Sequence, residues 1–232
     1  AVMKEILSLL NKEALSVNGK TVAENVADAK IMNPKMIKPL AQPWAAGGGL
    51  AVLRGNLAPD TCITKPAAIR SEIHQFTGKA HCFDSEEAAN QAILDRKVVE
   101  GEVVVIRYEG PKGGPGMREM YKAMKLLFGE GLALKTAVVT DGRFSGTNNG
   151  CFVGHISPEA AEGGPLAIVR DGDQITIDIP ARKLHLHLSD EEIKARLAQW
   201  KRPEPKFKKG YLALYSRLAE SADKGAIIRN KF

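Results

Sequence analysis

The sequence lacks several features that would assign a chain to a class of protein at once. Its 232 residues include only three cysteines, Cys62, Cys82 and Cys151, which are far apart and form no C-x-x-C pair. This odd, scattered set predicts free, buried thiols in a reducing cytoplasm rather than disulfides or a self-contained zinc site. No apolar run approaches the roughly 20 residues that a membrane-spanning helix needs, so no membrane partner is expected.

A concentrated positive charge is also missing, although the formal net charge is +6 and the pI is about 9.2. The 33 basic residues are interleaved with 27 acidic ones, and only residues 201–209 form a basic cluster, which Pro203 and Pro205 interrupt. This distribution favours a solvated tail over a phosphate-binding stripe, so nucleic acid is not an expected partner. Hydrophobic residues make up 44% of the chain, which is typical of a globular protein with a sizeable core.

The beginning of the chain has neither an initiator methionine nor the pattern of a signal peptide, which predicts a fragment of a longer protein. Residues 2–30 favour two short helical pieces, and the second is expected to start at Thr21 with Glu24 completing a capping box. Residues 33–43 are rich in proline and indicate a linker at a domain boundary.

The rest of the chain alternates strand-like and helix-like segments. Serines at positions 85 and 189 precede acidic residues, as N-caps do. Because strands outnumber helices and often adjoin, the pattern predicts a mixed α/β fold with a barrel-like sheet and flanking helices, not a doubly wound sheet. The predicted strands are 50–53, 103–106, 136–139, 166–169 and 175–179, and the predicted helices are 85–94, 117–128 and 190–200.

Residues 141–150, DGRFSGTNNG, are the most informative segment, because they follow a predicted buried strand and are unsuited to continuing it. Such a loop presents a hydroxyl and several N–H groups to a ligand. Ser145 is therefore a candidate nucleophile or base, with a turn residue as the alternative. The G-x-S-x-G elbow of hydrolases is absent, since position 143 is arginine. His155 could assist Ser145, although a single histidine after an apolar stretch is more often structural.

Residues 108–116 are expected to follow a strand and to open a helix, an arrangement that favours either an anion site or a long turn. In the helix predicted next, Glu119 falls in the first turn. There a glutamate is either a surface partner of the helix dipole or a ligand for a divalent cation, and spacing alone favours the surface role. His185 and His187 share one face of a strand and either decorate its surface or bind a metal as a pair.

Six segments, in order along the chain, resemble the dihydroxy-acid dehydratase and 6-phosphogluconate dehydratase family. They are residues 48–60, 83–88, 105–111, 113–120, 140–146 and 154–165. The resemblance implies that residues 46–232 form the family's C-terminal domain, a swivelling β-barrel with flanking helices. Residues 1–45 would then be the helical end of the N-terminal, cluster-binding domain together with its linker.

The resemblance also implies a chemistry, in which water is removed from a 2,3-dihydroxy carboxylic acid to give a 2-keto acid. The implied cofactors are Mg²⁺ and an iron–sulfur cluster whose ligands lie in the N-terminal domain; the three cysteines do not match them. By motif, Ser145 is the implied base and Glu119 an implied magnesium ligand, which reverses the preference from spacing alone. Substrate contacts are implied for Gly146, Thr147 and Asn148.

The identity of the substrate depends on two segments. Residues 50–60 resemble the dihydroxy-acid branch, which acts in branched-chain amino-acid biosynthesis, whereas residues 147–150 depart from it. A sugar-acid dehydratase acting on an aldonate or phosphogluconate is therefore an alternative, and so is an isolated domain without activity of its own. The expected partners are the small-molecule acid, the N-terminal domain and a second copy in a cytoplasmic homodimer.

Overall fold

The computed structural model describes residues 1–45, 47–144 and 150–229, and the chain forms two compact units, 1–48 and 49–232. The first unit contains α1 (Val2–Glu5), a 3-10 helix (Leu7–Leu9) and α2 (Val22–Val26). Thr21 caps α2 in a capping box with Glu24, as the sequence predicts. None of the described residues in this unit is buried, so it has no core of its own among them.

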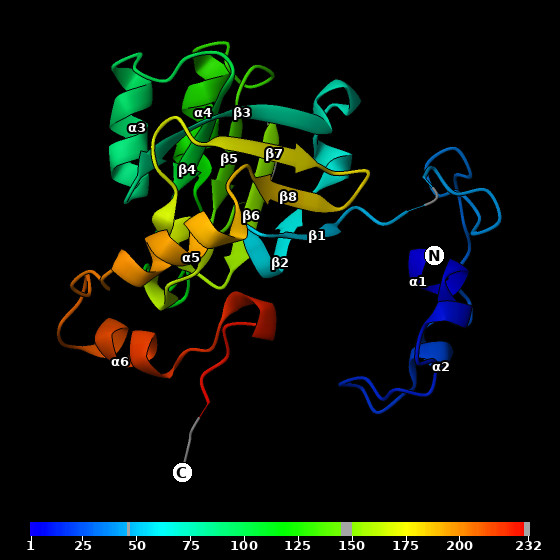
Figure 1. The fold of residues 1–232 in the computed structure, drawn as a ribbon. Coiled ribbons are helices and arrows are strands. Elements are labelled where there is room, and N and C mark those ends of the chain that lie inside the picture. The colour runs from blue at the N-terminus through cyan, green and yellow to red at the C-terminus, as the bar shows by residue number, and fades with distance from the viewer. Residues whose placement is uncertain (46, 145–149, 230–232) are drawn as a thin grey trace. The chain divides into compact units, whose positions relative to one another are not determined.

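The second unit is built around a closed eight-stranded β-barrel, which confirms the predicted barrel with flanking helices (Figure 1). Around the barrel the strands follow the order β1-β2-β6-β5-β4-β3-β7-β8. The strands are β1 (Ala51–Gly55), β2 (Ala58–Thr64), β3 (Gln75–Phe83), β4 (Glu102–Ile106), β5 (Ala137–Thr140), β6 (Cys151–Ser157), β7 (Gln174–Asp178) and β8 (Lys183–Leu186).

The barrel has a parallel half and an antiparallel half. Strands β3, β4, β5 and β6 pair with one another in parallel. On the other side, β1–β2 and β7–β8 are antiparallel pairs, and one parallel pair of residues between β1 and β8 closes the ring. Because parallel strands run in one direction, the loops that follow β3 to β6 begin at the same edge of the barrel.

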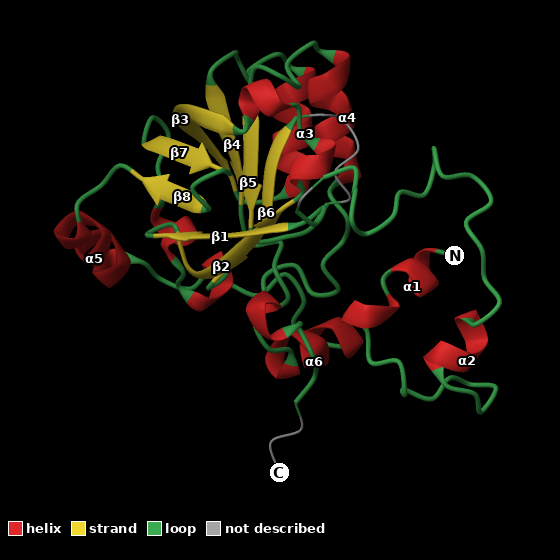
Figure 2. Cartoon of the chain, turned by 90° about the vertical axis from the view of Figure 1, so that its right-hand side faces the viewer, coloured by secondary structure: helices red, strands yellow, loops and turns green. Residues whose placement is uncertain are grey.

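Among the described residues, four α-helices accompany the barrel: α3 (Glu86–Leu94), α4 (Tyr121–Gly129), α5 (Asp190–Gln199) and α6 (Tyr211–Leu218). Figure 2 shows α3 and α4 next to each other beside the parallel strands. Val103 and Val105 point into the barrel core, while Val104 and Ile106 pack with α3 and α4 in a second core. This alternation places apolar residues on both faces of β4, which explains its uninterrupted apolar run.

Several sequence predictions of single elements are confirmed. Helices α3 and α5 lie where expected, and their caps Ser85 and Ser189 accept hydrogen bonds from the backbone of Ala88 and Glu192. Predicted strands correspond to β1, β4, β5 and β7. No described helix has the length and apolar character to cross a membrane.

Other predictions are wrong. Residues 166–169 were expected to be a strand, but Pro165–Ile168 is a 3-10 helix that begins with a proline, which suits a first helical turn. Helix α4 begins at Tyr121, not at Met117, because Met117 has a left-handed φ of 43°. No strand was predicted at β2, β3 or β6 and no helix at α6, whereas β8 confirms the strand expected at His185 but ends at Leu186, before His187. The remaining 3-10 helices are Pro66–Ala68, Ser71–Ile73, Ala160–Glu162 and Ala222–Lys224.

Candidate active site at the carboxyl edge of the parallel strands

The candidate site lies where the parallel strands end. The loop after β4 spans residues 107–120, the described start of the loop after β5 spans 141–144, and the loop after β6 begins at Pro158. Ligands of open α/β sheets bind at this edge, since loops from several strands converge there. The six segments that carry the sequence resemblance include all three of these loops.

Four of the residues predicted from the sequence, Ser145, Gly146, Thr147 and Asn148, lie outside the described residues. The residue before them, Phe144, is half-buried, and its ring packs against Phe152 of β6 with 5.6 Å between the ring centroids. The segment therefore starts from a point that is fixed against the core beneath α3 and α4.

Glu119 is described, and it lies beside the segment that leads to Ser145. Glu119 and Arg143 form an isolated parallel β-bridge, in which the backbone N–H of Met120 donates to the Arg143 carbonyl at 2.9 Å. The Arg143 side chain donates in turn to the Met117 carbonyl. The prediction that Glu119 occupies the first turn of a helix is wrong, because it precedes α4. The side chain of Glu119 is exposed, and its bridge partner, Arg143, precedes Ser145 by two positions in the sequence.

Asp141 connects the three loops, and the sequence analysis did not single it out. Its side chain is fully buried and accepts backbone hydrogen bonds from Tyr108 at 3.1 Å, Glu109 at 2.9 Å and Ala160 at 2.9 Å. Burial raises the pKa of Asp141 to about 6, because desolvation of the carboxylate outweighs the three N–H donors that lower it.

A second buried carboxylate, Glu159, holds the middle of the loop after β4. Its oxygens accept hydrogen bonds from the backbone of Lys112 and Gly113, each at 2.9 Å. Burial raises the pKa of Glu159 to about 7, and the nearby charge of Asp141 adds to the effect. The two carboxylates fix the loop from inside the fold.

These contacts revise the prediction for residues 108–116. The loop does present N–H groups to anions, but the anions are the carboxylates of Asp141 and Glu159, and the loop does not open directly into a helix. The two alternatives for this loop, an anion site and a long turn, are therefore compatible, because the turn is built around the carboxylates of Asp141 and Glu159. An acidic residue directly after a buried strand, as Asp141 is after β5, was the signal available in the sequence.

A third buried acid ties the C-terminal segment to the same edge. One oxygen of Glu109 accepts hydrogen bonds from the Glu86 backbone at 3.0 Å and from the Lys206 ammonium at 2.9 Å. Arg202 donates to the Ala161 carbonyl at 2.7 Å. The prediction that the basic cluster at 201–209 is a solvated tail is therefore wrong for these two side chains.

Backbone strain also gathers at this edge. Tyr108, Met117 and His155 have φ values of 64°, 43° and 54°, in a region that residues other than glycine seldom adopt. His155 donates its backbone N–H to the Gly142 carbonyl at 2.8 Å, and burial, followed by the charge of Arg143, lowers the pKa of its side chain. Strained residues tend to cluster at functional sites because the surrounding contacts hold them there.

Comparison with known proteins identifies the family. A family model described as "Dihydroxy-acid/6-phosphogluconate dehydratase C-terminal" matches residues 35–226. The chain belongs to this family.

Relatives of this dehydratase domain cover nearly all of the chain. A protein named "Dihydroxy-acid dehydratase" from Caldanaerobacter subterraneus is 53% identical over 99% of this chain. Proteins of the same name from Acetivibrio thermocellus and Desulfatibacillum aliphaticivorans are 52% and 49% identical over 100% and 98% of it. The chain spans 42%, 42% and 41% of the length of these three relatives.

The cofactors implied by the dehydratase resemblance can be tested against the donors in this domain. Among the described residues no three or more His, Cys, Asp or Glu side chains form a group that could hold a metal. Glu119 nevertheless suits Mg²⁺, which often binds through one or two carboxylates and completes its shell with water and substrate. His185 is partly buried on β8, and His187, exposed just after this strand, contacts Thr176 at 2.8 Å.

The cysteines do not fit an iron–sulfur cluster. Cys62 and Cys151 are completely buried in the barrel core, and Cys82 is partly buried on β3. Burial raises the pKa of each thiol to about 12, whereas cluster ligands are thiolates. The three thiols are free, as the sequence predicts.

Proposed function

We propose that this chain is the C-terminal part of a dihydroxy-acid dehydratase, a hydro-lyase that converts a 2,3-dihydroxy carboxylic acid into a 2-keto acid. The observation that carries the proposal is identity of about half over nearly the whole chain to proteins of that name. The arrangement of the loops supports it, because the family's segments meet at the carboxyl edge of the parallel strands.

In this proposal Ser145 removes the proton from C2 of the substrate. That proton is weakly acidic, so a positioned base is required. A serine hydroxyl is a poor base unless a cation stabilises its deprotonated form. The bridge between Glu119 and Arg143 supports the assignment, since it holds the backbone of Glu119 beside the segment that continues to Ser145.

Glu119 is the residue we assign to Mg²⁺. When bound, the cation would neutralise negative charge on substrate oxygens and favour deprotonation of a nearby hydroxyl. The backbone of Gly146 and the side chains of Thr147 and Asn148 are assigned to substrate binding. The iron–sulfur cluster would take its ligands from outside the described residues of this chain.

The longer protein supplies the remaining parts of the proposal. We assign residues 1–45 to the end of its N-terminal domain; the lack of buried residues among the described part of 1–48 supports this. The three free thiols support a cytoplasmic location. A homodimer and a role in branched-chain amino-acid biosynthesis rest on the resemblance, and light scattering of the longer protein tests the former.

A sugar-acid dehydratase of the same family is the second candidate. Asn148 and Asn149 favour it, because a polyhydroxylated acid requires more hydrogen-bonding groups than a branched aliphatic one. The two candidates share the base and the magnesium ligand, and they differ only in the substrate.

The decisive experiment restores the region that precedes this chain and assays the longer protein anaerobically with Mg²⁺. The substrates are 2,3-dihydroxyisovalerate and a panel of aldonic acids, including 6-phosphogluconate. Keto-acid formation should be at least ~100-fold faster with the branched acid, since one unpaired buried polar group costs a few kcal/mol. Preference for an aldonic acid would select the second candidate.

Two variants test the residue roles. Ser145→Ala should abolish turnover, whereas the matched control Ser71→Ala, at an exposed position of a 3-10 helix, should not change it. Glu119→Gln should raise the Mg²⁺ concentration that gives half-maximal activity, while Glu72→Gln should leave it unchanged. Full activity of Ser145→Ala would contradict the assignment of the base. Activity of the 232-residue chain alone would contradict the need for the preceding region.

A further inference from the structure

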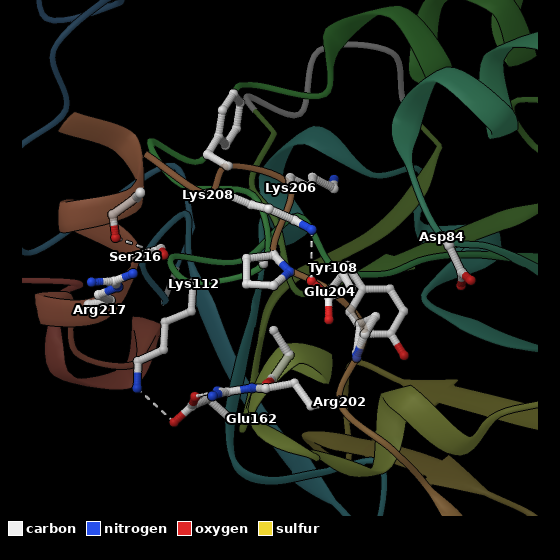
Figure 3. A pocket seen from close by; sticks show the side chains of 16 residues that line it. Asp84, Tyr108, Lys112, Glu162, Arg202, Glu204, Lys206, Lys208, Ser216 and Arg217 are labelled. Carbon is white, nitrogen blue, oxygen red and sulfur yellow. Dashed lines mark hydrogen bonds and ion pairs between the residues drawn. The ribbon is translucent and has the colours of Figure 1, made fainter. Parts of the chain in front are cut away.

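The second unit contains a pocket that the proposed dehydratase chemistry does not use. Its volume is about 590 Å³, within the range of small-molecule sites. It lies between the loop after β4, the segment 202–208 and helix α6 (Figure 3). Neither Glu119, Arg143 nor Phe144 lines it.

The walls of this pocket are held in place by contacts within the protein. Lys206 is paired with Glu109, whose side chain is only 5% exposed. Arg202 donates to the Ala161 carbonyl, and the Trp200 indole donates to the Tyr108 hydroxyl at 3.2 Å. These three contacts fix the segment 200–206 against two strand-end loops, so the pocket is formed before any ligand arrives.

The charges that line the pocket are mainly positive. Five basic side chains face three acidic ones: Lys112, Arg202, Lys206, Lys208 and Arg217 against Asp84, Glu162 and Glu204. Lys206 and Lys208 are paired with Glu109 and Glu204, whereas Lys112 and Arg202 share the single carboxylate of Glu162. The excess that remains after pairing therefore comes from this shared carboxylate and from Arg217. A site of this kind attracts anions and concentrates them near the surface.

Arg217 is the decisive side chain. It comes from α6, is exposed, and makes no ion pair or hydrogen bond with the residues that the structure describes. Figure 3 shows Arg217 on the same side of the pocket as Lys112 and Glu162, which come from two other segments. A guanidinium binds a carboxylate or phosphate through two parallel N–H donors.

Most of the remaining lining is apolar. Carbon surface is contributed by the side chains of Pro203, Pro205, Phe207 and Tyr108. The buried residues Ala161 and Ala213 complete this apolar part of the lining. Tyr108 holds its position with a left-handed φ of 64°. An inorganic ion would leave this surface empty, whereas an organic anion would cover it.

We propose that this pocket binds a small organic oxyanion, with its carboxylate or phosphate group on Arg217 and Lys112 and its carbon skeleton against Tyr108 and Phe207. The inference is independent of the proposed dehydratase activity, because it uses none of the residues assigned to that reaction.

Calorimetric titration tests the site, first with the 232-residue chain and then with the longer protein. The probes are succinate, inorganic phosphate and the uncharged succinamide, at constant ionic strength. Saturable binding of succinate or phosphate, with none of succinamide, is expected from both proteins. Succinate alone would assign a carboxylate ligand, and phosphate alone a phosphate ligand. Absence of binding by either protein would overturn the proposal.

Matched variants locate the binding. Arg217→Gln should weaken it about tenfold, which corresponds to about 1.4 kcal/mol. Lys194→Gln, the same loss of charge on the exposed face of α5, should leave it unchanged. Arg217→Lys should fall between the two, because it keeps the charge and loses the paired donors. Equal weakening in Arg217→Gln and Lys194→Gln would mean general attraction of anions and would overturn the site. Thermal melting verifies that all three variants fold.

Discussion

The two halves of the barrel satisfy their backbone polar groups in different ways. In the antiparallel half, strand ladders do so together with Asn56, between β1 and β2, which both donates to and accepts from the backbone of Leu186 of β8. The carboxylate that accepts a backbone N–H in the β7–β8 turn, Asp178 from Ala181, is an exposed contact. In the parallel half, the loops after the strands are held by the buried carboxylates Asp141, Glu159 and Glu109.

The difference follows from topology. An antiparallel pair can turn back at once and continue its ladder, whereas a parallel strand must enter a long connection whose N–H groups lack a partner strand. Carboxylates satisfy several N–H donors with one side chain, but their charge must be removed from water. The half that carries the candidate site is therefore more polar inside, and its stability depends on pH.

The largest effect is expected from removing Asp141. Asp141→Ala leaves three buried N–H groups without an acceptor, and the free energy of unfolding at pH 5 should fall by about 4 kcal/mol, since each unsatisfied group costs about 1–3 kcal/mol. Asn56→Ala, the counterpart in the antiparallel half, should cost about 1–2 kcal/mol. Urea denaturation measures both. Equal losses would remove the distinction between the halves.

The next effect is a pH dependence that arises from Asp141 in the parallel half. The pKa of Asp141 is raised from 3.8 to about 6 in the folded protein, so between these values the folded state keeps a proton that the unfolded state has released. Its contribution is therefore complete below pH 4 and is lost as the pH rises to about 6, a change of about 3 kcal/mol. In Asp141→Asn this part of the pH dependence should disappear from urea titrations. If the free energy of unfolding of Asp141→Asn and that of the unchanged protein varied with pH in the same way, the assignment to Asp141 would be contradicted.

A smaller effect should come from the close contact between two of the loops. A Cβ added at Gly110 would meet the carboxylate of Glu159 and lie 2.9 Å from its Cβ, so Gly110→Ala should lower the free energy of unfolding by about 2 kcal/mol. Gly129, at the end of α4, has open space around it. Gly129→Ala should therefore stabilise the protein by about 0.5 kcal/mol. Destabilisation of similar size in both would show that loop contact is not the cause.

The smallest effect is expected on the surface of the antiparallel half. The hydroxyls of Thr77 and Thr176 form an exposed cross-strand hydrogen bond of 2.8 Å between β3 and β7. Thr77→Ala should lower the free energy of unfolding by about 0.5 kcal/mol, the usual size of such a pair. Because the Thr176 hydroxyl also contacts His187 Nε2 at 2.8 Å, the measurement is made at one pH, beside that of Asp141→Ala. A loss as large as that of Asp141→Ala would contradict the difference between the two halves.

Much of this architecture could be predicted because local signals agree with the fold. Ser85 and Ser189 start helices where their sequences place them, and the apolar run of β4 indicates a buried strand. β3 was missed because it carries polar residues at its exposed positions and a glycine within it. Residues 166–169 resemble a strand by composition, but all four residues of Pro165–Ile168 are buried in a 3-10 helix.

The site was predictable in part and for a different reason. Long motifs identified the loops and their family, but motif spacing does not show which side chains turn inward. Glu119 was expected in a helix, and only the left-handed backbone at Met117 moves it into a bridge with Arg143. The inward orientation of Asp141 and Glu159 depends on loops from distant parts of the chain. Ser145, Gly146, Thr147 and Asn148 remain predictions.

The buried cysteines allow the local opening of the barrel to be measured directly. Cys62 and Cys151 are 0% exposed on β2 and β6, and a thiol-labelling reagent can reach them only when neighbouring strands separate. Cys82, partly buried on β3, provides an internal comparison. Mass spectrometry after pulsed alkylation would thus give an opening rate for each of three positions around the ring, without the introduction of a probe.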